Sequence, residues 1–228
     1  MHFLCLHGLG TNTQTLELQT APLRHLLPPS VSGSGYHTYD FIEGSHPHAP
    51  DPSLLPFASP TDSFHAYFLP SHPSTIIDAL RDLRDLLEEE EFDGIIGFSQ
   101  GSCLLATLLL SPLSPLRDPE SRCAIKMAVF LSPGMALDYE ALERGEYRMF
   151  NEKARTERIE GLVTAHVYGK NDQVAEGQGE FLWDLCRGRR ERSVHGQGHT
   201  VPGKGMHLDD AVRCMERAIE KAEGGFGF

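Results

Sequence analysis

The sequence predicts an α/β protein with a mostly parallel sheet of about six strands and helices on both faces. Apolar runs with the length of strands alternate with stretches of helical periodicity along the chain. Several apolar runs are continuous, which is typical of parallel strands buried on both sides. Loops carrying polar motifs follow these runs, at the sheet edge where sites of α/β proteins lie. Residues 1–228 are expected to form a single domain, because this length suits one α/β core.

The elements of the first part of the chain follow from these patterns. Residues 3–6 are a continuous apolar run and predict the first strand. Helical spacing over 15–27 ends at a Pro-Pro pair, which cannot continue a helix. Residues 36–42 alternate, as a strand with one buried face does. A helix is predicted over 74–91, with Ser74 as its N-cap and leucines at helical spacing.

The middle of the chain continues the alternation. Residues 92–97 predict a strand that leads directly into a strongly apolar helix over 102–110. Two Ser-Pro turns end that helix. Residues 124–131 are another apolar run, which stops at a Ser-Pro-Gly sequence and predicts a further buried strand.

The last part of the chain completes the sheet. A strand is predicted over 162–168 and a helix over 178–186. Residues 189–195 are short and polar, which suits a strand at the edge of the sheet. A closing helix is predicted over 207–222. Strands that alternate with helices in this way call for right-handed crossovers and parallel pairing.

Residues 43–73 differ from the rest of the chain. They hold seven prolines among aromatic residues and histidines, a composition that prevents long regular elements. An ordered loop of about 30 residues in a compact domain is usually a lid or a pocket wall. Its aromatic residues are therefore predicted to bind substrate: Phe57, Phe64, Tyr67 and Phe68. The alternative is a partly mobile surface loop.

The sequence Gly97-Phe98-Ser99-Gln100-Gly101 stands at a predicted strand-to-helix junction. A serine between glycines at such a junction occupies a sharp, strained turn that exposes its hydroxyl above the sheet. Side chains at the two glycine positions would collide with the turn. Ser99 is therefore the predicted nucleophile, and the alternative is an ordinary glycine-flanked turn.

A serine hydroxyl needs an adjacent base, and the base needs an orienting acid. With this kind of elbow the acid and then the histidine follow the serine along the chain. Asp172 follows a predicted strand and is favoured over Asp184, which falls within a predicted helix. His199 lies in a glycine-rich loop and is favoured as base over His195, which ends the edge strand. The predicted catalytic residues are thus Ser99, Asp172 and His199.

Two backbone amides are predicted to form an oxyanion hole. Gln100 follows the nucleophile and opens the next helix, whose N-terminus favours negative charge. The second amide is expected from the loop His7-Gly8-Leu9-Gly10 after the first strand, with Leu9 the best candidate. His7 is expected to brace that loop and not to transfer protons.

These motifs resemble those of the FSH-type serine hydrolases of fungi and yeasts, a compact branch of the α/β-hydrolase superfamily. The matching stretches are Phe3–Gly8, Gly97–Gly101, Gly169–Asp172 and Gly198–Pro202. The resemblance spans nearly the whole chain. It implies the α/β-hydrolase fold, with Ser99 as nucleophile, Asp172 as acid and His199 as base.

A narrower similarity is to members found beside fungal polyketide synthases. It is carried by Leu6–Asn12, Phe41–Gly44 and Phe92–Gly94. Some of those proteins are thioesterases that release a polyketide from a carrier protein, and others are esterases. The similarity implies a role in secondary metabolism and makes a polyketide synthase carrier protein one candidate partner. Docking an acidic carrier to a chain of net charge −12 would require a local basic patch such as Arg187, Arg189, Arg190 and Arg192, and the alternative for that run is an ordinary solvated edge strand.

Composition excludes several other functions. The net charge of −12 argues against partners such as nucleic acid and anionic membranes, which need basic surfaces. The five cysteines form no Cys-x-x-Cys pair, which argues against a disulfide framework and favours a cytoplasmic location. No cofactor is expected. A metal site at His46-Pro47-His48 is discounted, because no further ligand stands at a suitable spacing.

Three classes of function stay open on these grounds. The first is a serine hydrolase that cleaves an ester or thioester through an acyl-enzyme, including a carboxylesterase for small molecules. The second is a non-hydrolytic acyltransferase, cyclase or isomerase that acts on a pathway intermediate. The third is a binding module that keeps the fold without the chemistry. The oligomeric state is left open.

Overall fold

The computed structural model describes residues 1–29, 35–56, 58–151 and 157–224. Its centre is a parallel sheet of six strands in the order β2-β1-β5-β6-β7-β8. The strands are β1 (His2–Leu6), β2 (Thr38–Ile42), β5 (Gly94–Phe98), β6 (Met127–Leu131), β7 (Val163–Gly169) and β8 (Arg190–His195). All six correspond to strands predicted from the sequence, and the polar strand β8 lies at an edge as expected.

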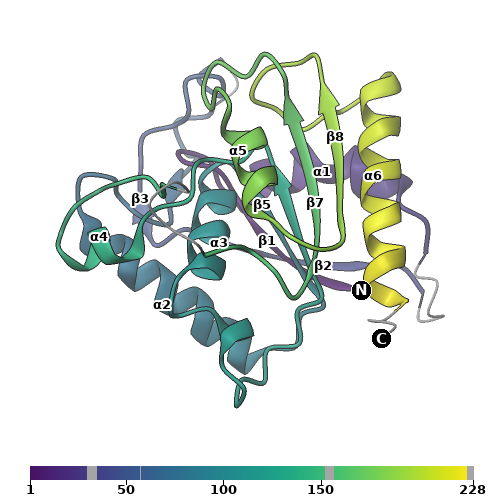
Figure 1. Ribbon diagram of the computed structural model, residues 1–228. Coiled ribbons are helices and arrows are strands. Elements are labelled where there is room, and N and C mark those ends of the chain that lie inside the picture. Colours follow the sequence, from purple (N-terminus) through teal and green to yellow (C-terminus); the bar gives the residue numbers. More distant parts are fainter. Residues whose placement is uncertain (30–34, 57, 152–156, 225–228) are drawn as a thin grey trace.

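Helices cover both faces of the sheet (Figure 1). One face packs against α1 (Thr13–Leu26) and α6 (Gly205–Glu223), with an apolar core that includes Phe3, Val129 and Met215. The other face packs against α2 (Pro73–Glu89), α3 (Gln100–Leu110), α4 (Tyr139–Glu143) and α5 (Gln178–Leu185). Two separate apolar cores therefore hold the sheet between them, as the predicted fold class requires.

Helix α3 lies at the centre of the molecule, and all of its residues are buried. It packs against strands β1, β5 and β6 and against α2. This explains why its sequence is apolar on every side and shows no amphipathic stripe. A helix so enclosed gives a rigid mount for the turn at its N-terminus, where Ser99 stands.

The prediction that Ser74 caps α2 is wrong. The helix begins at Pro73, with His72 as the N-cap, and His72 makes no side-chain capping hydrogen bond. Proline suits the first helical position, because its fixed φ matches the helix and its missing N–H has no intrahelical partner there. The short helix α4 and the 3₁₀ turn η1 (Pro115–Arg117) were not predicted.

The segment 43–73 contains a short antiparallel ribbon of β3 (His46–Pro47) and β4 (His65–Ala66). Thr11, in the loop after β1, makes an isolated β-bridge with His65. The segment is thus tied by backbone hydrogen bonds to the loop that carries Leu9. Its remaining described residues are turns and extended chain.

The five cysteines are free thiols, and four of them are buried. Burial raises the pKa of Cys103 and of Cys186 to about 12 each, so neither thiol ionises near neutral pH. Within the described ranges, no helix combines the length and apolarity that a membrane span requires.

Candidate active site

Ser99 occupies a strained turn between β5 and α3. Its φ of 51° and ψ of −109° lie in a region that side-chain-bearing residues rarely adopt. The turn is held on both sides, since the Ser99 amide donates to the Leu131 carbonyl at 3.1 Å and its carbonyl accepts from the Cys103 amide at 3.0 Å. The side chain is partly exposed while its neighbours are buried, so the hydroxyl can be reached.

Both glycines of the elbow are required by close packing, as predicted. A Cβ at Gly97 would lie 2.6 Å from the Ser102 amide, within the turn itself. A Cβ at Gly101 would lie 2.4 Å from the carbonyl oxygen of Leu6, which belongs to β1. The second glycine therefore serves the packing of α3 on the neighbouring strand, in addition to the turn.

Ser99, His199 and Asp172 form a hydrogen-bonded row. Ser99 Oγ lies 2.8 Å from His199 Nε2, and His199 Nδ1 lies 2.7 Å from Asp172 Oδ2. The carboxylate accepts the proton on Nδ1, which leaves Nε2 free to accept the Ser99 proton. The side chain of His199 is 14% exposed and that of Asp172 is 5% exposed. The structure thus brings together the three residues that the sequence predicted.

The Asp172 carboxylate is fixed by its own loop. Its Oδ1 accepts hydrogen bonds from the amides of Val174 and Ala175, each at 2.9 Å. Oδ2 remains for His199. The rival candidate Asp184 lies on α5, away from this loop.

His195, the other candidate base, has a different environment. It ends β8 and is 1% exposed, with its ring 6.1 Å from that of His207. Burial lowers the pKa of His195, so the ring is held neutral inside the protein. The side chain that meets Ser99 is that of His199.

The loop that carries His199 is shaped by two residues, Gly169 and Ser132, to which sequence analysis gave no such role. A Cβ at Gly169 would lie 2.1 Å from the Gln197 carbonyl, so only glycine lets this loop cross β7. The Ser132 hydroxyl donates to the Thr200 carbonyl at 3.1 Å, and Ser132 itself has a φ of 37°. The Ser-Pro-Gly sequence after β6 was the available signal, but it was interpreted only as the end of a strand.

The two amides predicted for the oxyanion hole lie beside the elbow. Within the described residues, neither the Leu9 amide nor the Gln100 amide donates to a protein acceptor. Gly8 packs against the Phe98 ring, since a Cβ there would lie 3.0 Å from it. Both amides are thus free to bind a substrate oxygen.

His7 braces the loop after β1, as expected. Nδ1 donates to the Gly8 carbonyl at 2.7 Å, and Nε2 accepts from the Gly44 amide at 2.9 Å. A ring that accepts at Nε2 is neutral, and burial lowers the pKa of His7, although the Glu43 carboxylate opposes this shift. His7 therefore joins the loop of Leu9 to the start of segment 43–73.

The side chain of Gln100 has a role that the sequence did not suggest. Oε1 accepts from the Tyr67 amide at 2.9 Å, and Nε2 donates to the Phe68 carbonyl at 3.0 Å. The Gln100 side chain is thus bound to the backbone of the far end of segment 43–73. Its backbone amide donates to no protein acceptor within the described residues and keeps its predicted role in the oxyanion hole.

The four aromatic residues predicted to bind substrate are placed differently from one another. Tyr67 and Phe68 are 5% and 2% exposed and belong to the apolar core on the α2 face, contrary to expectation. The Tyr67 hydroxyl donates to the Ile42 carbonyl at 2.8 Å, so it anchors the segment. Phe64 lines a cavity beside α1. Phe57 lies outside the described residues.

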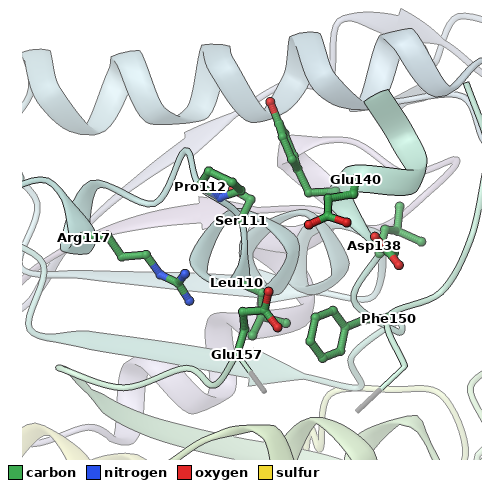
Figure 2. A pocket seen from close by; sticks show the side chains of 10 residues that line it. Leu110, Ser111, Pro112, Arg117, Asp138, Glu140, Phe150 and Glu157 are labelled. Carbon is green, nitrogen blue, oxygen red and sulfur yellow. The ribbon is translucent and has the colours of Figure 1, made fainter. Parts of the chain in front are cut away.

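Three cavities formed by described residues differ in size and place. Figure 2 shows the smallest, about 50 Å³, which Leu110, Arg117 and Phe150 help to line at the far end of α3 from Ser99. A second of about 270 Å³ lies beside Asp172 and includes Glu176. The third, about 410 Å³, lies between α1 and the described residues of 54–56 and 58–64. Only the third reaches the size of roughly 300–1,000 Å³ that small-molecule sites have.

Comparison with protein families decides the relationship. Residues 1–211 match the model of the serine hydrolase (FSH1) family. The chain belongs to the FSH1 serine hydrolase family. The match spans the elbow and the residues Ser99, Asp172 and His199. It confirms the family resemblance that was inferred from the sequence.

Individual relatives of this FSH1 family member support the same assignment. It is 33% identical over 225 residues to Esterase FPY3 of Fusarium mangiferae, covering 97% of this chain and 98% of that protein. It is 33% identical over 204 residues to Hydrolase phiM of Fungal sp. (strain ATCC 74256), covering 88% and 86%. The crystal structure of Arabidopsis thaliana SOBER1 matches with a TM-score of 0.59 at 17% identity, covering 98% of this chain and 99% of that chain. Solved structures of this kind show the α/β-hydrolase fold.

Proposed function

We propose that this protein hydrolyses an ester through an acyl-enzyme on Ser99. The observation that carries the proposal is the row of contacts from Ser99 Oγ to His199 Nε2 and from His199 Nδ1 to Asp172, at 2.8 and 2.7 Å. Such a row activates a hydroxyl that is otherwise a weak nucleophile at neutral pH. Relatives named as an esterase and a hydrolase favour the same reaction.

Acylation begins when His199 Nε2 removes the proton from Ser99 Oγ as the oxygen attacks the substrate carbonyl carbon. The carbonyl oxygen then carries negative charge, which the amides of Leu9 and Gln100 stabilise together with the N-terminus of α3. When this intermediate collapses, the bond to the leaving group breaks. The leaving group takes its proton from His199, and the acyl group stays on Ser99.

Deacylation repeats these steps with water in place of the serine. His199 removes a proton from water, which attacks the acyl carbon, and the bond to Ser99 Oγ breaks as the proton returns to the serine. Asp172 keeps the Nδ1 proton in place throughout and stabilises the imidazolium that forms. Asp172 Oδ1 accepts hydrogen bonds from two backbone amides, and these bonds hold the carboxylate in position for this role.

The contacts of the basic patch favour a small ester over a thioester on a carrier protein. Arg187 donates to the carbonyls of Asp184 and Cys186, and Arg190 donates to the carbonyls of Trp183 and Cys186. The Arg192 guanidinium lies 4.9 Å from the centre of the Trp183 ring. These groups serve the structure at the start of β8, whereas Ser99 lies beyond the carboxyl ends of the strands. A carrier-bound thioester, and with it a role in polyketide metabolism, is the second candidate, and its support is the set of motifs that resemble those of proteins found beside fungal polyketide synthases.

Labelling with a fluorophosphonate and hydrolysis of p-nitrophenyl esters test the proposal together. The protein is expected to be labelled at Ser99 and to release p-nitrophenol, and Ser99→Ala is expected to lose both. Undiminished hydrolysis by Ser99→Ala would falsify the proposal. Product analysis separates hydrolysis, which yields a free acid, from transfer or cyclisation, which does not. An acyl carrier thioester assayed beside the p-nitrophenyl esters decides between the two substrates.

A further inference from the structure

The cavity of about 410 Å³ between α1 and the described residues of 54–56 and 58–64 is not explained by the row of Ser99, His199 and Asp172. One wall is formed by the first two turns of α1, with Thr15, Leu18 and Gln19. The other is formed by the segment before β4, with Leu54, Ala58 and Phe64. The residues named in both walls are described ones, and the cavity has the size of a small-molecule site.

The cavity is coupled to the loop that carries Leu9. The Gly10 amide donates to the His65 carbonyl at 2.9 Å, and the Gly10 carbonyl accepts from the Asp51 amide at 2.8 Å. The Asn12 side chain donates to the Ser63 carbonyl at 2.8 Å. Three hydrogen bonds thus connect the loop, the start of α1 and the segment that closes the cavity. A ligand in the cavity touches the same framework that positions the Leu9 amide.

The distance from the cavity to the reacting atoms is limited by the chain. Asn12 lines the cavity and is only three residues from Leu9. Three residues span at most roughly 11 Å. The cavity therefore begins within roughly 11 Å of Leu9, a distance that one arm of a medium-length ester can span.

The lining selects an uncharged arm. Leu18, Leu54, Ala58 and Phe64 supply apolar surface, and the cavity has no lysine or arginine among its described lining residues. Its one carboxylate, Asp62, accepts a hydrogen bond from the Ser59 amide at 2.7 Å and disfavours an anionic group.

We propose that this cavity is a substrate subsite, which binds the uncharged, mainly apolar arm of the ester. The inference rests on the proposed ester hydrolysis for its enzymatic test, and on the cavity alone for its binding test. Two ester series identify the arm: p-nitrophenyl acetate against the octanoate varies the acyl side, and ethyl against octyl acetate varies the alcohol side.

The variant Ala58→Trp fills the cavity, and Ala49→Trp is its matched control. Ala49 lies in the same segment, is exposed, and does not line the cavity. In Ala58→Trp the ratio of kcat/KM for the long ester to that for the short one is expected to fall about tenfold in one series, and not in Ala49→Trp. An unchanged ratio in both series, or an equal fall in the control, overturns the subsite.

Binding is measured separately in a Ser99→Ala background, so that the result does not depend on catalysis. The probe is N-phenyl-1-naphthylamine, which is uncharged and mainly apolar and fluoresces more strongly in apolar surroundings. Saturable binding that is lost in Ala58→Trp and kept in Ala49→Trp supports the subsite. Binding that is absent, or that both variants keep, contradicts it even if Ser99 is shown to be the nucleophile. Absent hydrolysis with probe binding intact overturns the proposed function and leaves the cavity a binding site.

Discussion

Gln100 holds the backbone of Phe68 across the core, because its Nε2 donates to the Phe68 carbonyl at 3.0 Å while its Oε1 accepts from the amide of the preceding residue. The residue after the nucleophile thus has two uses. Its backbone amide is predicted to bind the substrate oxygen, and its side chain anchors the far end of segment 43–73. The near end is anchored by His7, through the Gly44 amide. Between these two anchors the segment is also held by Gly10, which bonds to the backbone of Asp51 and of His65.

Replacing Gln100 with alanine is expected to lower the free energy of unfolding by about 2–4 kcal/mol, because it leaves two buried backbone groups without partners. Urea denaturation measures the change. Gln19→Ala is the control, since Gln19 Oε1 has no partner to lose among the described residues. Equal stability of the two variants would show that the Gln100 anchor contributes little.

The strain at Ser99 predicts a difference in stability between two inactive variants, Ser99→Gly and Ser99→Ala. A positive φ raises the conformational free energy of a residue with a side chain by about 1–2 kcal/mol. For glycine the increase is close to zero. Ser99→Gly is therefore expected to unfold at a higher urea concentration than Ser99→Ala, although neither hydrolyses esters. The reverse order would mean that the turn at φ 51° is not strained in solution.

Asp172→Asn is expected to lower kcat by a factor on the order of 10⁴, because an amide no longer holds the His199 proton on Nδ1. The amides of Val174 and Ala175 can still donate to the Asn carbonyl, so circular dichroism should remain unchanged. Asp184→Asn is the matched control on α5 and should retain full activity. A small loss in Asp172→Asn would point to a different orienting acid.

His166 predicts a dependence of stability on pH. It is fully buried on β7, and burial lowers its pKa to about 3, below an unfolded value of about 6.5. The unfolded chain therefore binds this proton more readily than the native protein. The contribution of neutral His166 to the free energy of unfolding is nearly constant above pH 6.5. It decreases as the pH falls, by about 2 kcal/mol at pH 5.

The test compares urea denaturation of the wild type and His166→Phe at pH 7, 6 and 5. Phenylalanine keeps the ring contacts with Phe130 and Trp183 but cannot titrate. The variant is expected to lose less stability than the wild type over this range, even if it is less stable at pH 7 because Thr164 loses its partner. Parallel losses would exclude His166 as the source.

The sequence by itself determined the strands, most helices and the row of Ser99, His199 and Asp172. Continuous apolar runs define buried parallel strands, and the chain order of elbow, acid and histidine is tied to the carboxyl ends of those strands. The glycines around Ser99 were also predicted correctly, because their need follows from local geometry. Such features depend on residues close in the chain or on a period that sequence displays directly.

Only the tertiary structure decided what segment 43–73 does. A segment without a regular period gives no rule for which side chains point inward, so the core positions of Tyr67 and Phe68 could not be foreseen. The same holds for the bond between Gln100 and Phe68, which are 32 residues apart. Contacts between remote, irregular segments are fixed by how the whole core packs, and local sequence does not encode that packing.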